Sequence, residues 1–368
     1  MNGAIVPFPL RHTRVSREDG RRAAQRVFDT PITERAACAA ELHLEDPETL
    51  LNLTESLLSR VESSPADARD EAEFLFGFLE KPNRPIGQFD EREYFLGELA
   101  LIAGGACRFL FRREEARRWF VRAETYFVLT ENASANIARL AYQKLALLTE
   151  ERQFDEVLES APLWAACFKK LGLTDMALKC LFLEGNVLRE TGQLKAAIAV
   201  FERICEEAER INNIRLLGIG CGTLAHFHRF AGDLKAALAC AQRALPLLQQ
   251  TQNRVNLAKL RWCVGDIFRE QGNKAEALDA YRSALREAEE IGIRGDVAAI
   301  HLVLADLLLD AGMDRQAEWE VRAALPIIDE EQMVPEGYAA LGLLRESLRR
   351  RQIDRTALRE VHGYFPAG

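Results

Sequence analysis

The sequence predicts an all-α protein built from repeated pairs of antiparallel helices. Three kinds of position recur every forty residues, and a period shared by independent positions indicates a repeat architecture. Small residues return where two helices have to cross closely: Gly185, Ala225, Gly265 and Ala305. Glycines return where the first helix ends, and alanines return early in the second helix: Gly192, Gly232, Gly272 and Gly312, then Ala197, Ala237, Ala277 and Ala317. Each unit is therefore expected to be a helix, a tight turn and a second helix.

Residues 1–30 are predicted to be a flexible basic arm. Its positive charge comes from arginines at positions spread along the segment: Arg11, Arg14, Arg17, Arg21, Arg22 and Arg26. One interpretation is an electrostatic contact with an acidic partner or with RNA. The other is a solvated tail that leads into a frayed helix.

Residues 31–90 are predicted to form an N-terminal helical cap of three helices. Thr33 is a candidate N-cap of the first helix. Asp46 before Pro47, and Ser64 before Pro65, place a proline at the first position of the other two. The stretch 81–87 contains two prolines and a glycine and breaks the helical pattern. Because an end repeat exposes an uncovered hydrophobic face, we expect this cap to pack on the array.

Residues 91–368 are predicted to be the repeat array with its terminal cap. The first unit already shows the spacing of small, small, aromatic and small residues: Gly104, Ala116, Phe120 and Ala123. Four later units follow one another without a slip in register: 178–217, 218–257, 258–297 and 298–337. The last, incomplete unit begins near Tyr338 and is rich in arginine, so we expect it to form a polar end.

Charge and composition argue against several classes of function. The net charge is −8, whereas a nucleic-acid binder needs a basic field that releases phosphate counterions. No apolar run reaches the roughly 18 residues of a membrane span, and the first ten residues do not have the pattern of a signal peptide. The eight cysteines show no short paired spacing, so we expect free thiols in a cytoplasmic protein.

The units resemble the tetratricopeptide repeat family in its long, forty-residue form. That family places a small residue at position 8, alanine at 20, an aromatic at 24 and a small residue at 27. One unit matches all four positions: Gly265, Ala277, Tyr281 and Ala284. Position 4, usually aromatic, departs from the pattern in four units: Leu181, Cys221, Arg261 and His301. The resemblance covers about residues 97–361 and implies a right-handed superhelix of antiparallel helix pairs, an α-solenoid whose first helices line a concave groove.

The resemblance also implies which side chains face that groove. Positions 5, 9 and 12 of each first helix form one strip, because their spacing is that of a single helix face, and position 2 lies one turn earlier. The candidate partner-binding residues are Lys179, Phe182, Asn186, Arg189, His226, Arg229, Lys259, Trp262, Asp266 and Arg269. Arginine offers a planar fork to carboxylates and aromatic rings offer apolar anchors. We therefore expect a peptide or protein segment with acidic residues as the partner.

A second interpretation of the strip is internal. Arg229 would then pair with Asp266, and Arg269 with Asp306, and these pairs would join neighbouring repeats. Neither interpretation excludes the other.

We expect no catalytic residues, no cofactor and no metal site. His226 and His228 lie two residues apart on a helix and point in nearly opposite directions, so they cannot share a metal ion. The stretch Gly218-Ile-Gly-Cys-Gly222 lacks the strand and the lysine of a phosphate-binding loop. It is interpreted as a glycine-weakened first helix and a possible joint.

The predicted function is a non-catalytic scaffold or adaptor that binds a peptide or partner segment in the groove. The alternative is a peptide-sensing module of a signalling or transcription system, whose superhelix changes curvature on binding. A sensor needs a bistable element. The candidates are the glycine-rich stretch 218–222 and two prolines, Pro246 and Pro326, that are expected to kink their helices. An enzyme is the least favoured class, and the identity of the partner and the oligomeric state have no signature in the sequence.

Overall fold

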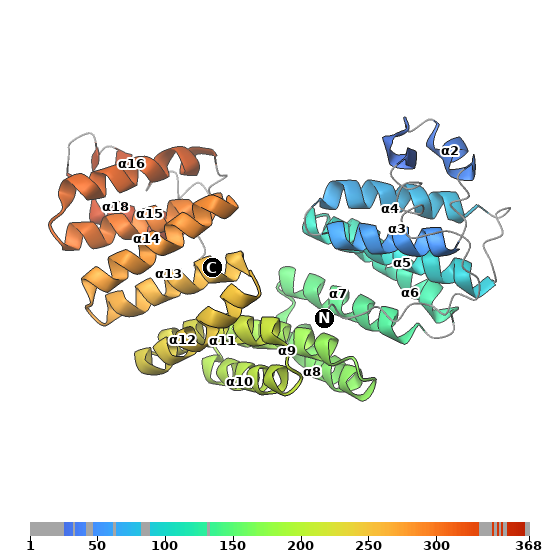
Figure 1. Cartoon of the computed structure of the whole chain (residues 1–368), viewed down its shortest axis with the longest axis horizontal. Helices are drawn as coiled ribbons and strands as arrows, with labels where there is room; N and C mark the ends of the chain where they lie inside the picture. The colour runs from blue at the N-terminus through green and yellow to red at the C-terminus, as the bar shows by residue number, and fades with distance from the viewer. Residues whose placement is uncertain are drawn as a thin grey trace. The chain divides into compact units, whose positions relative to one another are not determined.

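In the computed structural model, the described residues are 26–31, 34–41, 47–61, 64–81, 89–130, 133–330, 341, 344–345, 347–348 and 352–364. All regular structure in these ranges is helical (Figure 1). Most of the predicted arm, the candidate caps Thr33 and Asp46, the break at 82–87 and the start of the last unit near Tyr338 lie outside them. The chain divides into two compact units, Met1–Val187 and Leu188–Gly368, which are described in turn.

The first unit contains the predicted cap helices and the first repeats. Its helices are α2 (Arg35–Glu41), α3 (Pro47–Arg60), α4 (Pro65–Leu79), α5 (Phe89–Phe109), α6 (Arg113–Val128), α7 (Ser134–Glu150), α8 (Phe154–Lys170) and most of α9 (Thr174–Glu190). Two prolines begin helices as predicted, because a missing N–H does no harm in the first turn. Helices α2, α3 and α4 lie in the range predicted for the three cap helices.

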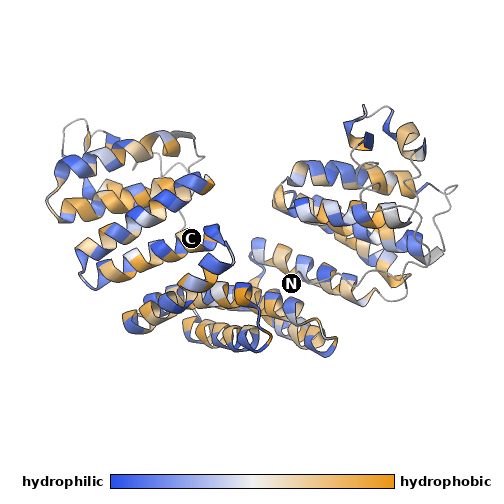
Figure 2. Ribbon diagram, in the orientation of Figure 1, coloured by the Kyte–Doolittle hydropathy of each residue, from blue (hydrophilic) through white to orange (hydrophobic). Residues whose placement is uncertain are grey.

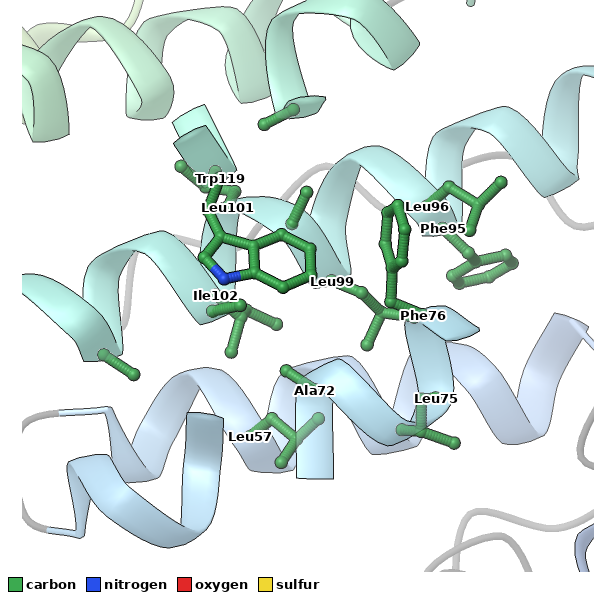
Figure 3. Close-up of a cluster of buried hydrophobic side chains, with 14 of the residues drawn as sticks. Leu57, Ala72, Leu75, Phe76, Phe95, Leu96, Leu99, Leu101, Ile102 and Trp119 are labelled. Carbon is green, nitrogen blue, oxygen red and sulfur yellow. The ribbon is translucent and has the colours of Figure 1, made fainter. Parts of the chain in front are cut away.

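The cap helices and the first repeat share one hydrophobic core. Trp119 of α6 packs edge-on against Phe76 of α4, with ring centroids 5.1 Å apart. Figure 3 shows these two rings with Leu57 and Ala72 from the cap helices and Ile102 from α5. All five side chains are buried or nearly so. The cap thus covers the hydrophobic face of the first repeat, which is the role expected for an end unit.

The second unit consists of consecutive helix pairs of nearly equal length. Its helices are the end of α9, then α10 (Leu194–Arg210), α11 (Ile214–Phe230), α12 (Leu234–Gln250), α13 (Arg254–Glu270), α14 (Lys274–Ile291), α15 (Arg294–Asp310), α16 (Asp314–Glu330) and α18 (Arg355–Gly363). First helices begin at residues 214, 254 and 294, and second helices at 194, 234, 274 and 314. The forty-residue period is therefore confirmed.

From α10 to α16 each helix packs on the next, α11 also packs on α13, and α18 packs on α15. Figure 2 shows that most of these helices carry both hydrophobic and hydrophilic residues, as expected for helices with one face in a core. None of the helices in the described part of the chain is both long and apolar enough to span a lipid bilayer. The predicted all-α fold of antiparallel helix pairs is confirmed.

The small residues at the helix crossings are required by the packing. A Cβ atom at Gly265 would lie 2.5 Å from Cδ1 of Tyr281, the aromatic residue of the same repeat. A Cβ atom at Gly104 would lie equally close, at 2.5 Å, to Cε1 of Phe120. In both repeats the ring of the second helix fills the space that the glycine leaves open on the first. The predicted register of small and aromatic residues is therefore confirmed.

Residues in the left-handed backbone region occur at the turns between consecutive helices. The glycines that were predicted to end first helices have φ between +71° and +82°: Gly192, Gly232, Gly272 and Gly312. A second series, not predicted, follows the second helices: Gly172, Asn212, Gln252 and Gly292. In that series Asn212 has φ of 54° and Gln252 has φ of 51°. Non-glycine residues adopt this conformation only at some energetic cost.

The glycine-rich stretch 218–222 lies inside an unbroken helix. A Cβ atom at Gly220 would lie 2.8 Å from Sγ of Cys205 in α10, and one at Gly218 would lie 3.1 Å from Cβ of Leu247 in α12. These glycines therefore allow α10 and α12 to approach α11 closely. Helices α12 and α16 also continue through Pro246 and Pro326.

Candidate functional site

The predicted strip begins on α9. In the first unit, Lys179 is exposed and its Nζ lies 5.7 Å from the centre of the Tyr142 ring. Phe182 is partly buried, and Asn186 on the next turn is exposed. Arg189 belongs to the second unit, where it is exposed and forms an ion pair with Glu190. All four residues occupy the helical spacing predicted for the strip.

Cations gather around His226 of α11 in the second unit. Burial is the main reason that the pKa of His226 falls to about 4, and the positive charges of Arg229, Lys259 and Arg189 lower it further. The imidazole is therefore neutral at pH 7, with one nitrogen that donates a hydrogen bond and one that accepts. We call Arg189, His226, Arg229 and Lys259 the basic section of the strip.

Arg229 joins two neighbouring first helices. Its Nη1 donates to Oε1 of Glu270 at 2.7 Å, and its Nη2 lies 3.5 Å from Oδ2 of Asp266. The Arg229 side chain is only 10% exposed. The internal interpretation is therefore correct for Arg229, which links α11 to α13.

The expected pair between Arg269 and Asp306 is wrong. Nη2 of Arg269 instead lies 3.8 Å from Oδ1 of Asp266, one turn earlier on the same helix. The reason is that Asp306 is engaged by two other arginines, which come from α18.

Asp266 is a buried carboxylate in the middle of the strip. The hydroxyl of Tyr281 donates to its Oδ1 at 2.7 Å. Burial raises the pKa of Asp266, while Arg229, the Tyr281 hydrogen bond and Arg269 act in the opposite direction. This carboxylate therefore ties together the two helices of its own repeat and the preceding first helix.

The short helix α18 covers the next part of the strip. Trp262 is only 4% exposed, and its ring centroid lies 6.3 Å from that of His362 on α18. Nε of Arg355 donates to Oδ1 of Asp306 at 2.7 Å, and Arg359 donates to both carboxylate oxygens of Asp306 at 3.2 Å. We call Trp262, Leu302, Asp306 and Asp310 the acidic section of the strip. Trp262 is thus not an open apolar anchor here, because α18 lies against it.

A cleft of about 400 Å³ remains between α18 and the helices beneath it. It is lined by residues of α13, α15 and α18: Arg269, Leu302, Val303, Asp306, Asp310, Leu358, Arg359 and His362. Within the described residues, no group of three histidine, cysteine or acidic side chains is arranged to hold a metal ion.

Sequence reasoning missed the contribution of α18 to the strip. The arginines of this helix were interpreted only as part of a polar end. A signal was present, because Arg355, Arg359 and His362 have the spacing of one helix face, and Asp306 and Asp310 also lie four residues apart. The two sets carry opposite charges, although nothing in their spacing along the chain shows that they meet.

Comparison with family models matches residues 178–210 and 220–290 to the tetratricopeptide repeat. The chain carries tetratricopeptide repeats. A comparison with curated proteins found no match. The matched residues include all of α10, α12 and α13, nearly all of α14, and parts of α9 and α11, and they contain most of the strip described above.

Several solved structures share the fold of this chain. The apo form of RapI aligns with a TM-score of 0.60 and 11% identity over 95% of both chains. Aspartyl phosphate phosphatase F from Bacillus subtilis aligns with a TM-score of 0.56 and 13% identity, over 97% of this chain and 94% of its own. NprR in complex with its cognate peptide NprX gives 0.54 and 15%, over 94% and 97%. A helical solenoid extending over nearly the whole chain follows from these likenesses.

Proposed function

We propose that this chain is a non-catalytic interaction module, a scaffold or adaptor that binds a peptide or a segment of a partner protein along the strip. The observation that carries the proposal is the basic section around His226. Arg189 is exposed and Lys259 is half-buried, so both can reach a ligand. The fold is one on which NprR binds its cognate peptide NprX, which supports a peptide as the ligand.

The ligand of the basic section is proposed to carry acidic residues. Carboxylates would be attracted by Arg189 and Lys259, and the neutral ring of His226 would supply a hydrogen bond. Arg229 contributes positive charge, but its two terminal nitrogens already face Glu270 and Asp266. The net charge of −8 would repel an acidic ligand elsewhere on the molecule, so a local basic section would direct it to this place.

The test compares two charge reversals in the full chain. A pull-down from native lysate with mass spectrometry identifies the partner, and the dissociation constant is then measured for each variant. Arg189→Glu with Lys259→Glu should weaken binding at least tenfold without loss of helicity, and binding to the unmodified chain should weaken as salt rises. The matched control is Arg203→Glu with Lys235→Glu, which reverses exposed cations on the second helices α10 and α12. Equal effects of the two pairs would contradict a site at the basic section.

A peptide sensor is the second candidate function. The observation that favours it is the cover formed by α18, since a part of the strip that is covered in the isolated chain could be uncovered. Small-angle scattering with and without the identified ligand separates the candidates, because the scattering curve of a scaffold stays the same and that of a sensor changes.

We also propose a cytoplasmic location, supported by eight unpaired cysteines.

A further inference from the structure

Helix α18 is too short to be stable by itself. It spans nine residues, and isolated helices shorter than about 12–15 residues are marginal in water. Its first turn is capped by Asp354, whose side chain accepts hydrogen bonds from the backbone N–H groups of Thr356 and Ala357. The rest of its stability has to come from the surface on which it lies.

The contact between α18 and that surface has a charged part and an apolar part. Asp306 is 8% exposed, and its carboxylate accepts from both Arg355 and Arg359. Arg355 also pairs with Asp310, one turn further along α15. The side chains of Arg355 and Arg359 remain 36% and 60% exposed, so water can compete for these arginines.

The apolar part of the contact consists of Ala357, Leu358 and Val361, which are all buried. Leu358 is fully buried and joins a hydrophobic cluster that includes Leu302. Beside Leu358 lies the cleft of about 400 Å³, which is open to solvent. Nε2 of His362 is buried with no hydrogen-bond partner among the described residues, which is unusual for a settled core. The surface would therefore accept a segment that fills more space and satisfies more polar groups than α18 does.

We propose that the acidic section is a binding site for a helical segment of a partner protein, and that α18 occupies this site until the segment displaces it. The segment carries two arginines four residues apart, to bind Asp306 and Asp310, and an apolar residue between them, to cover Leu302. This ligand has the opposite charge to the one proposed for the basic section. The proposal for the basic section and the proposal for the acidic section can therefore be tested independently.

The test adds a labelled peptide with the sequence of residues 352–364 to the full chain. In Arg355→Ala with Arg359→Ala, the chain's own α18 loses its contacts with Asp306, so the peptide should bind this variant at least tenfold more tightly than the unmodified chain. Adding Asp306→Asn to the variant should reduce peptide binding at least tenfold. A peptide in which both arginines are glutamine is the matched control and should not bind. A folded variant that binds both peptides equally, or neither, would overturn the proposal.

A second measurement needs no variant. Hydrogen exchange of the unmodified chain is followed at rising concentrations of the same peptide. We expect exchange to become faster at residues 355–363, because displaced α18 loses its support, while α15 stays protected because the peptide replaces α18 there. Unchanged exchange in α18 at a concentration where the peptide is bound would show that the helix is a permanent part of the core and that the proposal is wrong.

Discussion

Arg229 carries a buried charge between two repeats, and its removal should be costly. Its side chain is 10% exposed and contacts both Asp266 and Glu270. Breaking a buried pair by removing one partner costs about 3 kcal/mol or more, since the other charge is left uncompensated. Arg229→Met should therefore reduce the free energy of unfolding by about 3 kcal/mol in urea denaturation. Arg243→Met, which removes an exposed pair with Glu209, should change it by less than about 1 kcal/mol.

His226 should make the folded state sensitive to acid. Its folded pKa of about 4 lies below its usual value of 6.5, so the unfolded chain binds the proton more readily. Its contribution to stability is complete above pH 6.5 and is lost as the pH falls toward 4, at no more than about 1.4 kcal/mol per pH unit. His226→Gln cannot bind this proton and should lose less stability than the unmodified chain between pH 7 and pH 5. Unfolding curves at the two pH values check this, and parallel losses would mean that His226 is accessible to protons in the folded state.

The turns between helices are elements in which one backbone angle limits the choice of residue. Gln252 has φ of 51°, in the same place in the repeat as Gly292 with φ of 75°. Gln252→Gly should raise the free energy of unfolding by about 1 kcal/mol, because the left-handed region strains a residue with a Cβ atom. Gln249→Gly, three residues earlier and exposed inside α12, should instead lower it by about 1 kcal/mol. A decrease for both would show that the turn is not strained.

Helix pairs depend on one close crossing each. Gly265→Ala places a Cβ atom 2.5 Å from the Tyr281 ring, and overpacking of this kind costs about 1–3 kcal/mol. Gly295 has no atom within 4 Å of its Cβ position. Gly295→Ala should therefore stabilise α15 by about 0.5 kcal/mol through helix propensity alone. Melting temperatures of the two variants should move in opposite directions, and a harmless Gly265→Ala would mean that the two helices can move apart.

The helix pairs could be predicted from the sequence because their determinants are local. Gly265 and Tyr281 lie sixteen residues apart in a pattern that recurs, and glycines forty residues apart mark the ends of four first helices. The turns at Asn212 and Gln252 could not be predicted, because their backbone conformation is imposed by the helices on either side. The side chains themselves give no signal for a left-handed residue.

On the scale of the whole molecule, the chain should contain eight reactive thiols after unfolding. All eight cysteines are unpaired, and only Cys167 is exposed. Sγ of Cys205 and Sγ of Cys221 lie 3.8 Å apart between α10 and α11, which is far longer than a disulfide bond. Thiol titration without reductant should find eight groups in urea and rapid reaction of Cys167 in the folded protein. A count of six would indicate an unexpected disulfide.

The position of α18 could not be predicted from the sequence, because its contacts join residues that lie far apart along the chain. Asp306 and Arg355 lie 49 residues apart, and the contact of His362 with Trp262 joins two units that are not adjacent along the chain. The composition of the strip predicted its basic section, because those residues recur with the repeat. The acidic section is completed by α18 (Arg355–Gly363), a helix of the last, incomplete unit.

Equal helices and equal turns also make the repeat units interchangeable at their borders. Helices α10 to α16 begin at positions that recur every forty residues, so an in-frame gain or loss of one forty-residue unit would preserve the register of the helix pairs. The number of repeat units can then change, and the length of ligand that the array can bind changes with it. Helix α18 would remain packed on the last units whatever their number, so the same end helix could cover arrays of different lengths.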